Sequence, residues 1–405
     1  MSQGQALEES WRTLRESLDV PESQPRPASN GGGEPYVWRA LFSRSGRPLL
    51  VPATHRAAQE SSLRFFITRP RNRLFARVLL RAERLARRLG ALPEVRMAEP
   101  APGALLQRIK TNPATEVAFH IGTPGPYQKA TLLLMSPTGE PLTLAKLALN
   151  EDANPMVDSE AYWLEELARH GDIAAHVPRL LQHGKADNGR DYVLLSIVPG
   201  RETGSEVTPA HRAFLAALAQ ARLSVRPYSA SSTARFLDAA MHRLDGRIGF
   251  GPRVLLTSAM RDCARRLRTW YGPCVIAHGD FASWNIRRAG HGISVFDWEY
   301  ASDEAIALQD IMHFCLAPRA VADGTVEPAH LQESLQQAEA LAQSAHAGFA
   351  WSREIVALQA LAYLLHTVLF YSLSRDELPD WHPLVQAYLE LIRTRAQWAG
   401  SGTNS

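Results

Sequence analysis

Few cysteines, little net charge and no long apolar run characterise this sequence, and each shortage excludes a class of protein. The 405 residues include only three cysteines, which cannot form a disulfide framework and lack the paired short intervals of a zinc site. The net charge of +3 is too small to indicate nucleic-acid binding by itself. Because 45% of the residues are apolar and 21% are charged, disorder throughout and a fibrous repeat are excluded as well.

Signals for export or membrane insertion are also missing. The N-terminal residues contain no apolar stretch of the kind that marks a signal peptide. The longest apolar run, 355–371, contains Gln359 and His366 and falls short of the ~20 residues that a membrane-spanning helix needs. We therefore expect a cytoplasmic protein without a nucleic-acid partner, in which this run is a buried core helix.

Changes in composition divide the chain into five segments. Residues 1–35 combine a short amphipathic pattern with a flexible linker rich in Pro, Gly and Ser, and residues 36–112 are expected to form an extra α/β segment. Residues 113–200 are predicted to be a lobe of strands with one helix, residues 201–398 a helical lobe, and residues 399–405 a disordered tail. Strands first and helices later predict an α+β protein in two lobes.

Apolar periodicity predicts the individual elements, beginning with a hairpin at 36–53. The expected strands of the first lobe are 116–121, 130–135, 141–149 and 191–198, with a helix at 157–170. The expected helices of the second lobe are 209–222, 232–242, 253–270, 304–316, 327–346, 351–373 and 383–397.

The segment 64–89 is unusually basic, with nine arginines against a single acid, Glu83. From Arg73 onward, apolar residues share one helical face and arginines share another. The simplest interpretation is a helix packed on its own domain with its basic face in water. The alternative is contact with an anionic membrane surface or an acidic partner.

A polar, glycine-containing stretch interrupts the helical lobe and contains the candidate catalytic residues. It reads His278-Gly279-Asp280, with Asn285 five residues later, and Asp297 ends the next strand after a turn. A carboxylate can accept the proton of an acceptor hydroxyl, and oxygen ligands from two sides can bind Mg²⁺. The arrangement is that of a protein-kinase catalytic loop, with Gly279 where the kinase pattern has Arg.

This pair of motifs resembles the aminoglycoside phosphotransferase and choline kinase family, which has a bilobal protein-kinase-like fold. The resemblance covers about residues 115–397. It implies that Asp280 is the catalytic base and that Asn285 and Asp297 hold Mg²⁺. His278 is placed with the catalytic residues as the group that orients the loop, although a buried structural histidine is the alternative.

Two further acids lie near the motif. Glu299 contacts metal through water, contacts an acceptor, or caps the following helix. The family places a helix aspartate where Asp310 stands, and we interpret Asp310 as a structural brace of the catalytic loop.

The resemblance also implies the parts of a nucleotide site in the first lobe. Lys146 lies in an apolar strand, where a lysine is costly unless it is paired, and Glu160 lies early in the next helix. The family pattern pairs two such residues to position the α- and β-phosphates of ATP. The alternative is an edge strand whose lysine points into water.

Two backbone segments complete the expected nucleotide site. Gly122 and Gly125 lie in a turn between strands and would let the backbone approach phosphate oxygens, but two neighbouring prolines remove N–H donors, so a plain hairpin turn is the alternative. Ser196, Ile197 and Val198 resemble the hinge whose backbone binds adenine.

We therefore expect an ATP-dependent phosphotransferase that uses Mg²⁺ and a small-molecule hydroxyl acceptor, such as a sugar, an amino sugar, an amino alcohol or a saccharide precursor. Two other functions stay open. The first is a protein kinase, which the short path from Asp297 to the following helix disfavours. The second is a catalytically silent nucleotide-binding scaffold.

Both acids and aromatics are available for the acceptor, so the sequence does not decide between a polycation and a choline-like cation. The acids are Asp303, Glu304, Asp376, Glu377 and Asp380, and the aromatics are Trp284, Trp298, Tyr300 and Trp381.

Overall fold

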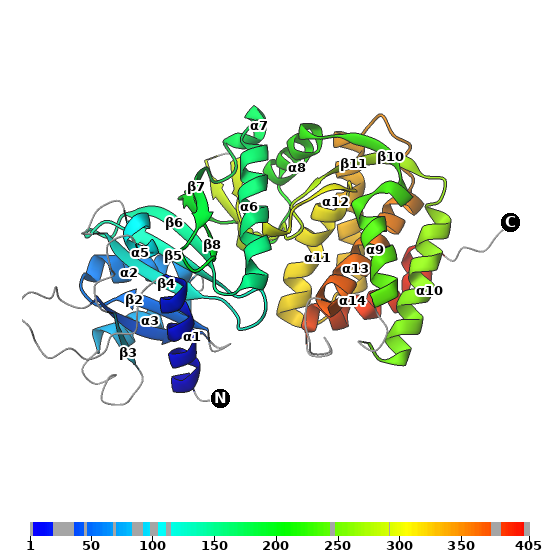
Figure 1. The fold of residues 1–405 in the computed structure, drawn as a ribbon. Coiled ribbons are helices and arrows are strands. Elements are labelled where there is room, and N and C mark those ends of the chain that lie inside the picture. The colour runs from blue at the N-terminus through cyan, green and yellow to red at the C-terminus, as the bar shows by residue number, and fades with distance from the viewer. Residues whose placement is uncertain are drawn as a thin grey trace, which may run out of the picture. The chain divides into compact units, whose positions relative to one another are not determined.

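The structure is a computed structural model that comprises two compact units, Met1–Glu165 with Pro178–Ile197, and Glu166–Val177 with Val198–Ser405 (Figure 1). The residues it describes are 3–18, 36–43, 47–67, 70–82, 92–97, 104–110, 115–243, 248–290, 292–373 and 382–400. The expected linker and the last five residues of the expected tail lie outside these ranges.

An eight-stranded antiparallel sheet forms the centre of the first unit. In spatial order its strands are β3 (Glu94–Met97), β1 (Tyr36–Phe42), β2 (Pro48–Pro52), β4 (Glu116–Ile121), β5 (Lys129–Met135), β6 (Pro141–Ala148), β8 (Asp191–Ser196) and β7 (Leu180–Lys185). The expected hairpin at 36–53 and the four expected strands are confirmed. β7 was not expected, because its Gln-His-Gly-Lys sequence has little apolar character. The strands before residue 100 extend the same sheet.

Helices cover both faces of this sheet, and the alternation of side chains decides which residues meet them. One face carries a large apolar cluster, together with α1 (Gln3–Ser17) and α5 (Leu105–Ile109). The other face carries two smaller clusters with α2 (Arg56–Phe66) and α3 (Pro70–Arg81). In β6, Ala145 and Leu147 join the large cluster, whereas Leu144 joins the other face. Lys146 therefore lies on the face opposite the large cluster.

The second unit is built around the apolar helix α13 (Arg353–Leu373), as Figure 1 shows. Its neighbours are α9 (Ser232–Arg243), α10 (Phe250–Arg266), α11 (Gln309–Asp323), α12 (Pro328–Ala345) and α14 (Pro383–Arg393). The unit also contains α7 (Gly171–Ala174), α8 (Pro209–Ala221) and α15 (Arg395–Trp398). By length and composition α13 could cross a membrane, but 78% of its most apolar window is buried in the protein, which confirms the expected core helix.

Two small sheets interrupt the helices of the second unit. One is β10 (Ser224–Pro227), β11 (Tyr271–Ala277) and β14 (Ser302–Ile306), and the other is β13 (Gly292–Val295), β12 (Ile286–Ala289) and β9 (Arg201–Glu202). The helix expected at 304–316 is wrong at its start, because Ala305 and Ile306 pair with Val275 and Cys274 of β11. Pairing with a buried strand overrides the local helical pattern there.

Candidate functional site

A buried carboxylate fixes the path of the loop that follows β11. Asp310, at the start of α11, accepts hydrogen bonds from the backbone N–H groups of His278 (2.7 Å) and Gly279 (3.1 Å). Burial raises the pKa of Asp310, while the two backbone donors oppose the rise. The structure thus supports the interpretation of Asp310 as a brace.

Gly279 is required at the next position of the loop. Its φ is +82°, and an added Cβ would lie 2.3 Å from the backbone oxygen of Tyr300. A residue with a Cβ does not fit here unless the backbone moves, which explains why glycine stands where the kinase pattern has arginine.

His278 is fully buried, and both of its ring nitrogens are engaged inside the protein. Nδ1 accepts from the backbone N–H of Asp280 (3.2 Å), and Nε2 lies 3.0 Å from the backbone oxygen of Phe296. Because a carbonyl can only accept, the ring proton lies on Nε2. We therefore assign His278 to positioning the loop.

The carboxylate of Asp280 is held by three side-chain donors. Oδ2 accepts from Trp284 Nε1 (3.2 Å) and Asn285 Nδ2 (2.7 Å), and Oδ1 accepts from His313 Nε2 (2.9 Å). The side chain is 22% exposed, so solvent or a small molecule can reach it. A fixed, partly open carboxylate is what a general base requires.

Asn285 and Asp297 leave the same end of a hairpin. Ile286 pairs with Val295, and the backbone N–H of Phe296 donates to Asn285 O (3.1 Å). In an antiparallel pair, the residue before one strand and the residues after the other lie side by side. The spacing of the two motifs is therefore explained by one tight turn.

The amide orientation of Asn285 leaves its oxygen available for a cation. Nδ2 donates to the backbone oxygen (3.0 Å) and to the carboxylate (2.7 Å) of Asp280, and both of these groups are acceptors. The amide nitrogen must therefore face Asp280, and Oδ1 is the atom that could bind a metal. Asn285 is also buried, which restricts the amide to this orientation.

Asp297 has a left-handed backbone, with φ of +73° and ψ of 59°. Its carboxylate and that of the buried Glu299 lie within 4.8 Å of each other. Glu299 does not cap a following helix, because α11 begins only at Gln309. Two neighbouring carboxylates are hard oxygen ligands of the kind that a divalent cation binds.

The other acids near the motif are already paired with arginines. Arg222 Nε lies 3.2 Å from Asp303, and Glu304 lies 2.5 Å from Arg226 and 3.0 Å from Arg235. These contacts make both acids poor candidates for binding a cationic acceptor. The acids and the tryptophan at 376–381 lie outside the described residues.

Lys146 and Glu160 form a buried ion pair in the first unit. Lys146 Nζ lies 2.6 Å from Glu160 Oε1, and the two side chains are 9% and 1% exposed. β6 lies between β5 and β8, so the edge-strand alternative for Lys146 is excluded. The pairing that the family pattern implies is present.

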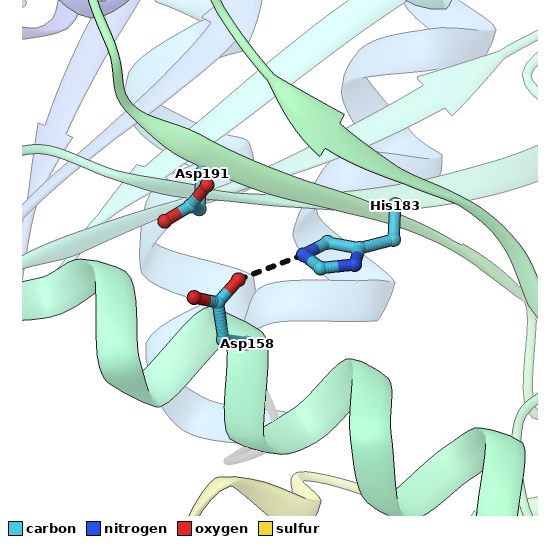
Figure 2. A group of neighbouring side chains, drawn as sticks. All are labelled: Asp158, His183 and Asp191. Atoms are coloured by element: carbon cyan, nitrogen blue, oxygen red, sulfur yellow. Dashed lines mark hydrogen bonds and ion pairs between the residues drawn. The ribbon is translucent and has the colours of Figure 1, made fainter.

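Two more contacts hold the helix that carries Glu160, α6 (Asn154–Leu167), against the sheet. Asn154 Oδ1 accepts the backbone N–H of Asp191 (3.0 Å), and His183 Nε2 lies 2.8 Å from Asp158 Oδ1. Figure 2 shows Asp158, His183 and Asp191 grouped between α6, β7 and β8.

This group contains three potential metal ligands, but its acids already have partners. Asp158 is paired with His183, and the buried Asp191 is paired with Lys185, whose pKa this hydrogen bond raises. We therefore interpret the group as an ion-pair cluster that secures the position of α6.

Backbone groups of both glycines in the turn between β4 and β5 form hydrogen bonds within the first unit. The N–H of Gly122 donates to Lys129 O (2.8 Å), and Gly125 O accepts from Asn150 Nδ2 (2.9 Å). The N–H of Gly122 is thus used within the hairpin, which fits the plain-turn alternative as well as it fits a phosphate loop.

The expected hinge lies at the boundary between the two units. Ser196 ends β8, its backbone N–H donates to Arg179 O (2.9 Å), and Ile197 packs on the apolar cluster of the first unit. The division falls between Ile197 and Val198. These residues therefore lie at the chain connection between the two units.

Sequence reasoning missed His313 and the hydrogen bond from Trp284 to Asp280. Asp310 and His313 are three residues apart on α11, and side chains at this spacing lie on one helical face. Once Asp310 is taken as the brace of the loop, this spacing is a signal that could have found His313.

Comparison with known proteins identifies the family. The model of the phosphotransferase enzyme family matches residues 139–362, more than half of the chain, whereas no curated protein sequence matches. A thermostable mutant of the aminoglycoside phosphotransferase APH(4)-Ia has a TM-score of 0.50 and 14% identity, covering 71% of this chain and 97% of its own. Choline kinase from Cryptosporidium parvum has a TM-score of 0.49 and 10% identity, covering 72% and 91%.

At such identities, a structural likeness concerns the fold alone. It confirms the expected α+β protein-kinase-like fold, and the family match confirms the resemblance that the His278 and Asp297 motifs carry. The chain belongs to the phosphotransferase enzyme family.

Proposed function

We propose that this protein uses ATP and Mg²⁺ to transfer the γ-phosphate to a hydroxyl group of a small molecule. The observation that carries this proposal is the Asp280 carboxylate, which three donors fix at the end of a braced loop and which is still partly open. Asp280 accepts the proton of the acceptor hydroxyl on a carboxylate oxygen.

The residues present fit a magnesium ion. Asn285 offers an amide oxygen and Asp297 a carboxylate, which are the hard oxygen ligands that Mg²⁺ prefers. When bound, the ion neutralises charge on the triphosphate. His278 and Asp310 keep both ligands and the base in register by fixing the loop between them.

The first unit supplies the nucleotide contacts in this proposal. Lys146, held by Glu160, contacts the α- and β-phosphates, and the backbone of Ser196–Val198 contacts adenine. The buried pair supports this role, because a lysine enclosed in a central strand needs a fixed partner to stay charged.

A small hydroxyl compound is favoured over a protein as acceptor. Only residues 298–308 separate Asp297 from α11, and β14 occupies part of this stretch. This leaves no long segment to support a peptide. The pairing of Asp303 and Glu304 with arginines favours a sugar or amino alcohol over a polycationic aminoglycoside.

A coupled assay of ADP release tests this function. We expect the protein with Mg-ATP and a panel of sugars, amino sugars and amino alcohols to release ADP above its rate in water alone, and to phosphorylate the same compound. Phosphorylation of protein substrates alone would favour a protein kinase. Binding of ATP without turnover on any acceptor or on water would favour the silent scaffold.

We further propose that helix α3 brings the protein to an anionic membrane surface. Leu74, Phe75 and Val78 are 60%, 65% and 53% exposed on one side of this helix, and Arg71 and Arg81 are exposed beside them. An exposed apolar ridge with arginines at its edges suits an interface of anionic lipids.

Other arginines of α3 contact neighbouring residues of the protein, whereas the simplest expectation placed the basic side of this helix in water. Arg77 Nη2 lies 2.7 Å from Glu60, and Arg73 donates to Ile67 O (2.9 Å). Residues 68, 69 and 83–89 of the basic segment lie outside the described residues.

Cosedimentation with vesicles tests the membrane contact. We expect binding to phosphatidylcholine vesicles with about 30% phosphatidylserine, and loss of binding at about 1 M salt or with phosphatidylcholine alone. Phe75→Ser should weaken binding, while Val321→Ser, at an exposed residue of the second unit, should not. Equal binding by both variants would refute the role of α3.

A further inference from the structure

A chain of hydrogen bonds runs from the candidate base into the core of the second unit. His313 Nε2 lies 2.9 Å from Asp280 Oδ1, and Tyr363 Oη lies 3.1 Å from His313 Nδ1. Tyr388 Oη lies 2.7 Å from Tyr363 Oη. The three residues come from α11, α13 and α14, so a hydrogen-bond chain built from three packed helices reaches one carboxylate oxygen of Asp280.

This chain is rigid because it is buried. His313 is 4% exposed, Tyr363 is 1% exposed and Tyr388 is fully buried. The ring of Tyr363 meets those of His313 and Tyr388 edge to face, at 5.8 Å between centroids in each pair. Neither the histidine nor the tyrosines can change rotamer without opening the core.

The direction of the first hydrogen bond of the chain is set by Asp280. The carboxylate of Asp280 accepts, so His313 Nε2 must carry a proton. When the ring is neutral, Tyr363 donates to Nδ1, and when the ring is charged, Tyr363 accepts from it and donates to Tyr388. The bond to Asp280 is the same in both states.

Both tyrosines stay protonated in this role. Burial raises the pKa of Tyr363 and of Tyr388 well above the usual range. Each protonated hydroxyl can act as both donor and acceptor.

The contact with His313 completes the fixation of the base. A carboxylate has about four lone-pair directions, and among the described residues Trp284, Asn285 and His313 occupy three of them. Within the carboxylate, Trp284 and Asn285 bind only Oδ2, so His313 is the donor that holds Oδ1 and opposes rotation of the carboxylate about its Cβ–Cγ bond. The fourth lone-pair direction of the Asp280 carboxylate is then fixed in space.

We propose that His313, held by Tyr363 and Tyr388, is a positioning residue that orients the Asp280 carboxylate toward the acceptor hydroxyl. This inference rests on the proposed phosphotransferase function. It adds a group outside the two catalytic motifs, and it assigns that group to the orientation of the base rather than to ATP binding.

Steady-state kinetics of the full-length chain with Mg-ATP test this role, with water as the acceptor and with any compound that the acceptor panel identifies. We expect His313→Ala to lower kcat between about 10-fold and 100-fold, because a carboxylate held only through Oδ2 is less well aligned with the acceptor hydroxyl. The KM for ATP should stay within about twofold, because the substitution removes no proposed contact with the nucleotide.

Three companion variants separate positioning from folding. His313→Gln keeps an N–H donor near the Nε2 position and should recover most of the lost kcat. Tyr363→Phe removes only the hydroxyl and should lower kcat by less than His313→Ala. His346→Gln changes another buried histidine of the same unit, which makes no contact with Asp280, and should leave kcat unchanged. Thermal unfolding of each variant shows whether the fold is retained.

The outcomes distinguish this inference from the function on which it rests. A wild-type chain that binds ATP but never releases ADP overturns the phosphotransferase proposal and the inference with it. An active wild type with unchanged kcat in His313→Ala overturns the inference alone. An equal loss of kcat in the alanine and glutamine variants would also overturn it, because the donor would then be irrelevant.

Discussion

Replacing Asp280 by alanine is expected to lower phosphoryl transfer between about 10²-fold and 10⁴-fold, the range typical of a lost general base. The acceptor hydroxyl would have no group to take its proton, while Lys146 and Glu160, in the other unit, would be unchanged. Turnover and binding of a non-hydrolysable ATP analogue should therefore separate: kcat falls and the dissociation constant changes little.

The fold should survive this change at modest cost. The three donors to Asp280 would lose an acceptor, but the site is partly open and water can replace it. Asp238→Ala, at an exposed residue of α9, is the matched control and should behave as wild type. Near-normal turnover of Asp280→Ala would defeat the assignment of the base.

Replacing Asp297 by asparagine should have an effect of similar size through the metal. The left-handed backbone at this position, with φ of +73°, is one that asparagine adopts about as readily as aspartate, whereas alanine would add strain. The asparagine variant thus removes the charge and keeps the shape. We expect turnover to fall by at least about 10²-fold, in line with the loss of a charge that stabilises the transferring phosphoryl group.

A titration of turnover against Mg²⁺ checks this expectation. The variant should need a higher Mg²⁺ concentration for half-maximal turnover, because one of the two ligands is weakened. Asp323→Asn, near the end of α11, is the control. An unchanged Mg²⁺ dependence would exclude Asp297 as a ligand and would leave its carboxylate with a structural role beside Glu299.

Local features made much of the fold predictable. The strands β4, β5, β6 and β8 are apolar runs bounded by turn residues, so their positions follow from sequence alone. β7 and β14 could not be predicted, because a polar strand and a short strand before a helix exist only through their partners. β14 forms because β11 offers it backbone hydrogen bonds within a buried sheet.

The candidate site divides in the same way. His278, Asp280, Asn285 and Asp297 lie within one turn-and-hairpin unit, so their spacing in sequence carries their proximity in space. Lys146 and Glu160 are 14 residues apart, and their pairing could be expected only from the family pattern. Which acids near the motif are neutralised depends on Arg222, Arg226 and Arg235, which come from other segments.

By itself, the sequence determined the α+β order of elements, the candidate catalytic loop and the family, because each depends on residues that are neighbours along the chain. Only the tertiary structure decided that Lys146 lies in a central strand, that α3 exposes an apolar ridge, and that a hydrogen-bond chain links Tyr388, Tyr363 and His313 to Asp280. The physical reason is distance along the chain. Hydrogen bonds between helices that are 25 to 50 residues apart leave no periodic signal, and they form only when packing brings their faces together.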